Sequence, residues 1–388
     1  MNRADEIERL KQRLESIGDP RDGHGKRHAF VDILCIALVA MLAGADDADA
    51  FEEFGLVHKT WLRQWLTLEH GIPSQDTFLR VFAAIDPVAF RTVFREWVGA
   101  IRQTFDRGHV AIDGKTARRS FDTASGAKAI HTVSAWLSED GLVLGQQAVA
   151  EKSNEIDAIP ELLALLNIRG TTVTIDAMGC QRAIAEKIVE RKAHYILAVK
   201  DNQPTLRANI AGFFEDAERT HRPVDDPPPV IETATEVDSG HGRVVERKCD
   251  VSRDLSWVQS KDAWVGMGAI ARVQSRSHDK VTGATSTDER LYIISHPTAS
   301  ATDVQRWVRA HWGIENRLHW VLDVASQEDQ SRIRAKHAAE NFAIIRHVVL
   351  NMIRAAPGKK KSVALRRKRC GWDLNYLLSV LVAAPTAD

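Results

Sequence analysis

The spacing of apolar residues at the start of the chain predicts helices. The run FVDILCIALVAMLAG, residues 30–44, is apolar on nearly all sides and predicts a helix buried in the centre of a domain. The later run DPVAFRTVFREWVGAIRQTF has apolar residues at helical spacing. It opens with Asp86 in a capping position and Pro87, which suits the first turn of a helix. We therefore predict an all-helical N-terminal domain over residues 1–105.

From residue 106 the pattern changes to short β-branched runs that alternate with amphipathic stretches. HVAID, AIHTVSAWL and LVLGQQAV predict three strands, and TTVTID and HYILAVK predict two more with helical stretches between them. Three consecutive strands followed by strand–helix crossovers require a mixed sheet with helices on its faces. Residues 106–219 therefore predict an α/β fold and form the first part of a ribonuclease H-like mixed sheet flanked by helices.

The remaining chain predicts an insertion, a helical completion and a tail. Residues 220–298 begin near the Pro-rich RPVDDPPPV and contain GRVVERKCDV, WVGMGAIARVQSR and ERLYIISHP, which predict a β-rich insertion. Residues 299–356 have helical spacing and complete the α/β domain. Residues 357–388 are a basic C-terminal tail, in which seven of the eleven residues from 359 to 369 are Lys or Arg.

Composition and charge are those of an ordinary globular chain. The 388 residues are 44% hydrophobic and carry 52 basic and 52 acidic side chains, so no net charge attracts the whole molecule to a polyanion. The four cysteines lie far apart without metal-ligand spacing, and the longest apolar run contains Asp32 and is short for a membrane span. The charged start does not resemble a signal peptide. We expect a cytoplasmic protein with reduced thiols and no membrane partner.

Two of the predicted strands end in Ile-Asp before a small residue. Parallel pairing of these strands would place Asp113 and Asp176 side by side at one sheet edge. Adjacent carboxylates repel unless a proton or a cation lies between them, and Mg²⁺ prefers oxygen ligands. A two-metal site usually needs a third acid. Glu315 is the candidate, because Asp323 lies about 12 Å further along the same predicted helix at ~1.5 Å per residue.

The motifs AIDGK, TIDA and HWGIENRLHWVLDV, in this order, resemble the DDE transposases of bacterial insertion sequences, in particular the ISAs group of H-repeat-associated proteins. The resemblance runs through nearly the whole chain. It implies that Asp113, Asp176 and Glu315 are the catalytic acids and bind two Mg²⁺ ions, for which Mn²⁺ can substitute. It also implies that the protein hydrolyses a phosphodiester at each element end and joins the freed 3′-hydroxyl to target DNA.

The resemblance further implies double-stranded DNA as the partner, terminal inverted repeats read by the N-terminal helices, a homodimer, and a place at the nucleoid. Basic side chains near the predicted site and in the tail are candidate phosphate contacts, and each is equally compatible with a solvated charge. They are Lys115, Arg118, Arg119, Lys200, Arg309, His311, His319, Lys359, Lys360, Lys361, Arg366, Arg367, Lys368 and Arg369.

Two other functions fit the same residues. A Mg²⁺-dependent nuclease on this fold would cut DNA without joining it, and a silent or domesticated relative would bind DNA without catalysis. The three intact acids argue against the silent relative. In its favour, many related transposases carry a Tyr, Arg, Glu, Lys signature on the third-acid helix, whereas this chain has Val308, His311 and Leu322 at the three positions other than Glu.

Overall fold

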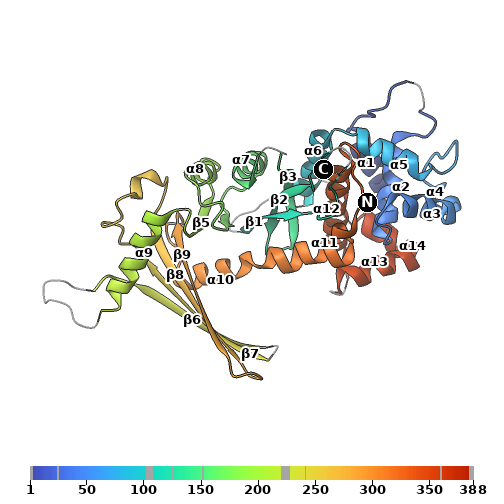
Figure 1. The fold of residues 1–388 in the computed structure, drawn as a ribbon. Coiled ribbons are helices and arrows are strands. Elements are labelled where there is room, and N and C mark those ends of the chain that lie inside the picture. The colour runs from blue at the N-terminus through green and yellow to red at the C-terminus, as the bar shows by residue number, and fades with distance from the viewer. Residues whose placement is uncertain are drawn as a thin grey trace.

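The computed structural model describes residues 3–23, 26–101, 108–121, 123, 126, 128–150, 153–219, 228–240, 242–358 and 361–383. A bundle of helices forms one end of the elongated molecule, a sheet lies in the middle, and the long strands of residues 232–294 project from the other end (Figure 1). Most of the predicted Pro-rich connector, the predicted boundary at 105–106, and two candidate DNA contacts, Lys359 and Lys360, lie outside the described residues.

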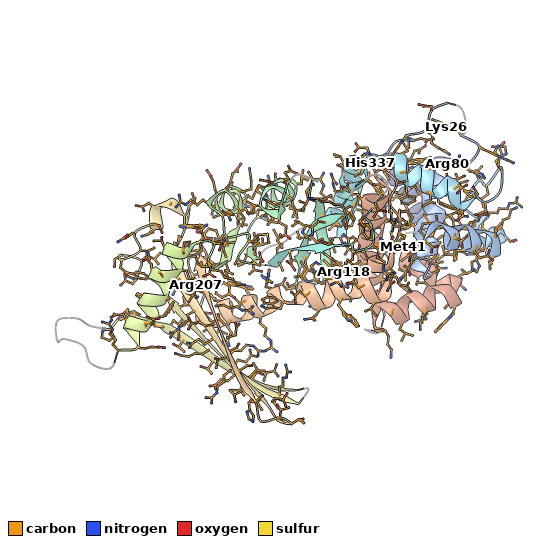
Figure 2. All side chains as sticks on the ribbon, in the orientation of Figure 1. Lys26, Met41, Arg80, Arg118, Arg207 and His337 are labelled. Atoms are coloured by element: carbon orange, nitrogen blue, oxygen red, sulfur yellow. The ribbon has the colours of Figure 1, made fainter. Side chains whose placement is uncertain are left out.

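The N-terminal region is helical, as the apolar spacing predicts. Its helices are α1 (Arg3–Glu15), α2 (Phe30–Leu42), α3 (Ala48–Val57), α4 (Lys59–Leu62), α5 (Gln75–Ala84) and α6 (Pro87–Ile101). Every residue of α2 except Val31 is buried, and Met41 lies deep within this end of the molecule (Figure 2). The Asp86 carboxylate accepts the Val88 N–H at 3.0 Å, so α6 begins at the predicted cap.

The strand order confirms the predicted ribonuclease H-like sheet. The first five strands are β1 (His109–Thr116), β2 (His131–Leu137), β3 (Leu142–Ala148), β4 (Thr172–Ile175) and β5 (His194–Val199). Their order in the sheet is β3-β2-β1-β4-β5. β1 pairs antiparallel with β2 and parallel with β4, which in turn pairs parallel with β5. The carboxyl ends of β1, β4 and β5 therefore meet at one edge of the sheet.

The β-rich segment continues this sheet. It contains β6 (Glu232–Gly240), β7 (Arg243–Ser252), β8 (Ala269–Asp279) and β9 (Thr285–Ile294), an antiparallel meander in which β9 pairs with β5. The sequence predicts only three of these strands. β6 was missed because eight of its nine residues are exposed, so its sequence, ETATEVDSG, lacks the alternation that a half-buried strand shows.

Helices cover both faces of the sheet. The upper face in Figure 1 carries α7 (Glu155–Leu165) and α8 (Arg182–Glu190), and α9 (Pro204–Ala217) lies beside the projecting strands. The lower face carries α10 (Ala301–His311), which contacts β1, β4, β6 and β7. The π-helical segment η2 (Glu315–His319) and α11 (Trp320–Ala325) follow, and α12 (Ala338–Ala355) packs between β3 and the N-terminal helices. Within the described residues, no helix has the length and apolar character that a bilayer crossing needs.

The basic tail contains two packed helices, α13 (Val363–Trp372) and α14 (Leu374–Leu381). Arg366 and Arg367 are buried, which corrects their prediction as phosphate contacts. Arg366 donates to the Ala356 carbonyl oxygen at 2.7 Å and to the Tyr376 hydroxyl at 2.8 Å. Their guanidinium groups fix α13 to the rest of the fold, whereas Lys361, Lys368 and Arg369 remain exposed.

Replacing Arg367 is expected to destabilise the junction between the two ends of the chain. Its guanidinium donates to the carbonyl oxygens of Met41 and Ala325 and pairs with the Asp46 carboxylate at 2.7 Å. Arg367→Ala leaves these acceptors unpaired and should lower the free energy of unfolding by about 3 kcal/mol, measured by urea denaturation. The exposed neighbour Lys368→Ala should change it by less than about 0.5 kcal/mol. Equal effects of the two changes would contradict this role.

Candidate active site

The sheet places Asp113 and Asp176 next to each other. β1 and β4 run parallel with Ile112 opposite Ile175, so the residue that follows each is an aspartate at the same level of the sheet. β1 continues to Thr116, so Asp113 lies within its strand rather than at the end. Asp176 lies just beyond β4. Its carboxylate accepts N–H groups from the following turn at 3.0 and 3.3 Å, which fixes its orientation.

The electrostatic environment of both aspartates favours their protonated form. The pKa of Asp113 is raised to about 7, mainly by burial and also by the charges of Glu155, Asp176 and Glu315, against the opposing effect of the Gly114 N–H. Burial and the charge of Glu155 also raise the pKa of Asp176, while turn N–H groups and Lys200 act in the opposite direction. The site thus concentrates carboxylate charge that a bound cation would compensate.

The third predicted acid, Glu315, begins a π-helical segment. The predicted long helix is interrupted after His311, and η2 widens the helical turn between α10 and α11. Single π-helical turns within α-helices frequently occur at functional sites. Glu315 is exposed, yet its charge reaches Asp113. Among the described residues, no three His, Cys, Asp or Glu side chains are arranged closely enough to hold a metal ion. Oxygen donors suited to Mg²⁺ are present, and Glu315 would have to move inward to join them.

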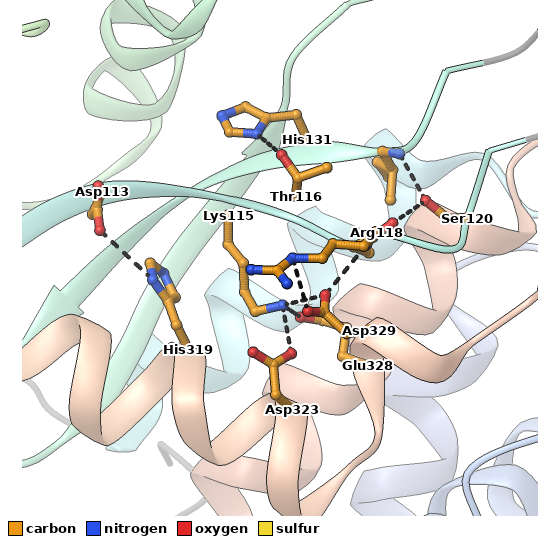
Figure 3. A network of polar contacts seen from close by, with 12 residues as sticks. Asp113, Lys115, Thr116, Arg118, Ser120, His131, His319, Asp323, Glu328 and Asp329 are labelled. Carbon is orange, nitrogen blue, oxygen red and sulfur yellow. Dashed lines mark hydrogen bonds and ion pairs between the residues drawn. The ribbon is translucent and has the colours of Figure 1, made fainter.

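His319 faces Asp113 from the helix, with 3.6 Å between Nδ1 and Oδ2 (Figure 3). Burial and the nearby positive charge of Lys115 lower the pKa of His319 to about 4, so the imidazole is neutral at pH 7. A neutral ring at this distance makes neither an ion pair nor a hydrogen bond with the carboxylate. The uncharged ring is turned towards the sheet, and a role of His319 in phosphate binding stays a prediction.

Lys115 is held in a cluster of acids. Its ammonium lies 2.7 Å from Asp323, 3.1 Å from Glu328 and 3.2 Å from Asp329, and its side chain is only 11% exposed (Figure 3). Burial lowers the pKa of Lys115, but these acids outweigh burial and raise it overall. In this arrangement the charge of Lys115 is compensated by acids of the protein, and its role as a phosphate contact stays a prediction. The side chain joins β1 to the helices that follow Glu315.

The other basic candidates near the site differ in accessibility. Arg118 is 82% exposed and lies 3.3 Å from Asp329, and Arg119 is exposed and donates to Gln330 at 3.2 Å. Lys200, just after β5, is also exposed. A role in phosphate binding stays a prediction for all three. Arg309 is also exposed, but it forms ion pairs with Glu236 at 2.5 Å and Asp238 at 2.7 Å on β6, and these acids compensate its charge.

His311 belongs to a buried chain of hydrogen bonds. Its Nδ1 lies 2.9 Å from the Thr174 hydroxyl, which contacts His109 Nε2 at 2.8 Å, and His109 Nδ1 contacts the Ser138 hydroxyl at 2.8 Å. Burial lowers the pKa of His311 to about 4 and that of His109 to about 3, so both rings are neutral. The prediction of His311 as a phosphate contact is wrong, because its ring bonds α10 to the centre of the sheet.

Glu155, at the first position of α7, is a site residue that the sequence analysis missed. Its side chain is 16% exposed and accepts a hydrogen bond from His131 Nε2 at 2.6 Å, and its charge acts on both Asp113 and Asp176. An acid in the first turn of a helix is common because the helix dipole favours it. The sequence feature that could have indicated a group close to Asp113 is Gly114, since a glycine inside a strand often marks close approach by another group.

Comparison with known proteins identifies the family. Residues 104–352 match the family described as Transposase DDE domain, and residues 11–98 match the one described as DDE_Tnp_1-associated. The chain therefore belongs to the DDE-domain transposase family, which confirms the resemblance seen in the sequence.

Curated relatives span the chain. The protein named "Putative transposase YncI" of Escherichia coli O157:H7 is 37% identical over 97% of this chain and 95% of its own length. The "H repeat-associated putative transposase YhhI" of Escherichia coli strain K12 is 36% identical over 98% of this chain and 99% of its own. The shorter "Inactive transposase YbfQ" of the same strain is 33% identical over 20% of this chain and 90% of its own.

The raised pKa of Asp113 predicts a pH-dependent effect of Asp113→Asn. The pKa of Asp113 is about 7 in the folded protein and 3.8 for an ordinary aspartate. The wild-type free energy of unfolding therefore falls as the pH rises from 3.8 towards 7, because the unfolded chain ionises this carboxyl more readily than the folded protein does. In EDTA, the free energy of unfolding of Asp113→Asn relative to that of wild type should therefore increase by about 3 kcal/mol between pH 5 and pH 8. Urea denaturation at each pH measures this difference. The exposed acid change Asp157→Asn should show no such trend, and a pH-independent difference for Asp113→Asn would refute the burial of its charge.

The Lys115 cluster predicts a strong stability difference between two basic residues that share Asp329. Lys115→Met leaves three acids near one another without their buried cation and should lower the free energy of unfolding by about 3 kcal/mol. Arg118→Met removes a largely exposed partner of the same acid and should cost less than about 1 kcal/mol. Thermal and urea unfolding of the two variants would measure this, and similar losses would mean that Lys115 is not the buried link.

Proposed function

We propose that this protein is an active transposase that cuts DNA at the ends of an insertion sequence and joins the ends to target DNA. The observation that supports this most is the adjacency of Asp113 and Asp176 in a transposase DDE domain that also retains Glu315. In the first step water attacks a phosphodiester and releases a 3′-hydroxyl. In the second step that hydroxyl attacks a target phosphodiester, so one DNA bond forms as another breaks.

The three acids would bind divalent metal, Mg²⁺ or Mn²⁺, which when bound activates the attacking oxygen and stabilises the leaving oxygen. Asp176 is oriented by the turn that follows it, and the helix carrying Glu315 is held to β1 through Lys115. No nucleophilic side chain is required, because water and the DNA 3′-hydroxyl attack in turn. The charge cluster at Asp113 and Asp176 supports a cation at this place.

The DNA partners follow from the same proposal. Three exposed basic residues near the site suit contacts with DNA phosphates: Arg118, Arg119 and Lys200. Lys361, Lys368 and Arg369 in the tail suit non-specific contacts, because clustered positive charge displaces counterions from DNA. We assign recognition of the terminal inverted repeats to the N-terminal helices, and two copies of the chain to the complex that pairs two ends. Such a protein would act at the nucleoid in the cytoplasm.

A silent DNA-binding relative is the second candidate. Two observations favour it: Glu315 is exposed rather than gathered with the two aspartates, and one curated relative is named an inactive transposase. A nuclease that cuts without joining would need the same acids, so it differs from the transposase only in the second step.

The proposal predicts metal-dependent cutting that depends on all three acids. Labelled duplexes carrying the DNA that flanks the gene would be incubated with Mg²⁺ or Mn²⁺ and a supercoiled target plasmid. Asp113→Asn, Asp176→Asn and Glu315→Gln should each reduce nicking and joining by at least about a hundredfold, because each removes a metal-binding charge. Glu186→Gln, an exposed acid change on α8, should keep wild-type activity.

The products separate the three functions. Nicked and joined DNA supports the transposase, whereas nicks without joined products support the nuclease. Retained DNA binding without any product, with either metal, would reject both enzymes in favour of the silent relative. Activity that survives Glu315→Gln would show that another residue is the third acid.

A further inference from the structure

The carboxylate of Glu155 lies over the strand that carries Asp113. Asn154 caps α7 by accepting the N–H of Asp157 at 3.3 Å, and Glu155 is the first helical residue. A solvated acid at this position would be the ordinary arrangement. Here the carboxylate is instead turned onto β1, where it is largely removed from water.

Gly114 makes this approach possible. A Cβ atom at position 114 would lie 2.2 Å from Glu155 Oε1 and 2.6 Å from His131 Nε2, distances that real Cβ atoms do not adopt. Any other residue directly after Asp113 would therefore displace the carboxylate or the imidazole. Since glycine costs stability inside a strand, its presence here fits a requirement for the close approach of Glu155.

His131 holds the carboxylate in place. It stands opposite Thr116 across the β1–β2 pair, and its Nδ1 lies 2.7 Å from the Thr116 hydroxyl. Its other ring nitrogen, Nε2, lies 2.6 Å from Glu155 Oε1. The carboxylate is therefore fixed through two strands of the sheet, and its position does not depend on α7 alone.

The site of Glu155 is open to a ligand. His131, Glu155 and Met178 line a cavity of about 620 Å³, and the basic residues Lys128, Arg334 and Lys336 line it as well. Met178 belongs to the turn whose N–H groups bind Asp176. The cavity therefore runs from Glu155 to the segment directly after the second aspartate, and its basic lining suits a phosphate backbone.

We propose that Glu155 is a fourth carboxylate of the active site and binds divalent metal together with Asp113 and Asp176. The three carboxylates are not close enough to hold an ion in the conformation described, so metal binding would draw them together. This inference rests on the proposed function. Glu155 comes from α7 on one face of the sheet, whereas Glu315 comes from the segment after α10 on the opposite face (Figure 1). The two aspartates in the sheet are thus flanked by one glutamate from each side. The charge of Glu155 raises the pKa of both aspartates, which agrees with its position over Gly114, the residue after Asp113.

Metal affinity of the full-length chain tests this role. Mn²⁺ binding would be measured by isothermal titration calorimetry and by the electron paramagnetic resonance signal of free Mn²⁺, without DNA. Glu155→Gln should weaken binding by about tenfold or more, as loss of a metal-site group commonly does. Asp157→Asn removes an exposed acid from the same helical turn and should leave the affinity within about twofold of wild type, because its side chain is directed elsewhere.

Two further variants guard against a merely structural effect. Gly114→Ala keeps all the acids but displaces Glu155, and it should weaken Mn²⁺ binding in the same direction. Glu155→Asp restores the charge and should recover part of the affinity. Unfolding temperatures in EDTA identify any variant that loses binding by unfolding. Wild-type affinity in folded Glu155→Gln or in folded Gly114→Ala would overturn the inference.

Asp113→Asn separates this inference from the proposed function. If Asp113→Asn weakens Mn²⁺ binding and Glu155→Gln does not, the metal site of the transposase stands and the role of Glu155 is rejected. If neither change affects Mn²⁺ binding, the metal-dependent function fails together with the inference. Weakened binding in both variants supports both.

Discussion

The contact between Lys115 and Asp323 fixes how the sheet and the helix of the third acid lie against each other. Asp113 and Lys115 are two residues apart on one face of β1, which is about 6.6 Å along a strand. His319 and Asp323 are four residues apart on the helix, which is about 6 Å along its axis. The spacings match, so Asp113 faces His319 where Lys115 faces Asp323. A buried ammonium is stable only beside its acids, and this requirement holds the two elements in register.

The β-rich extension supports the same helix from its other end. The α10 capping residue is followed by Ala301, whose N–H bonds to Glu232 of β6 at 2.9 Å. Gln305 donates to the Arg247 carbonyl oxygen of β7 at 3.1 Å, and Arg309 pairs with acids of β6. The strands of the extension and the helix that leads to the third acid therefore pack as one unit. This gives the extension a physical role in positioning Glu315, in addition to any contact with DNA.

The carboxylates of the site impose a cost on folding that agrees with a cation-binding function. Asp113 and Asp176 are drawn together by strand pairing and partly removed from water, and nearby glutamates add repulsion. A protein selected for stability alone would replace or separate these groups. The neighbouring Lys115 does not relieve the repulsion, because Asp323, Glu328 and Asp329 already compensate its charge.

The sequence by itself determined the helical start, the ribonuclease H-like strand order and the pair Asp113 and Asp176, because periodicity and strand ends are local patterns that parallel pairing brings together. The tertiary structure alone decided which charges are buried. Arg367 resembles any tail arginine in the sequence, but α13 packs it against the Met41 carbonyl oxygen of α2. The π-helical turn at Glu315 and the approach of Glu155 to Gly114 likewise depend on contacts between segments distant in the chain. Burial, hydrogen bonding and charge compensation arise only when such segments meet, so no local pattern encodes them.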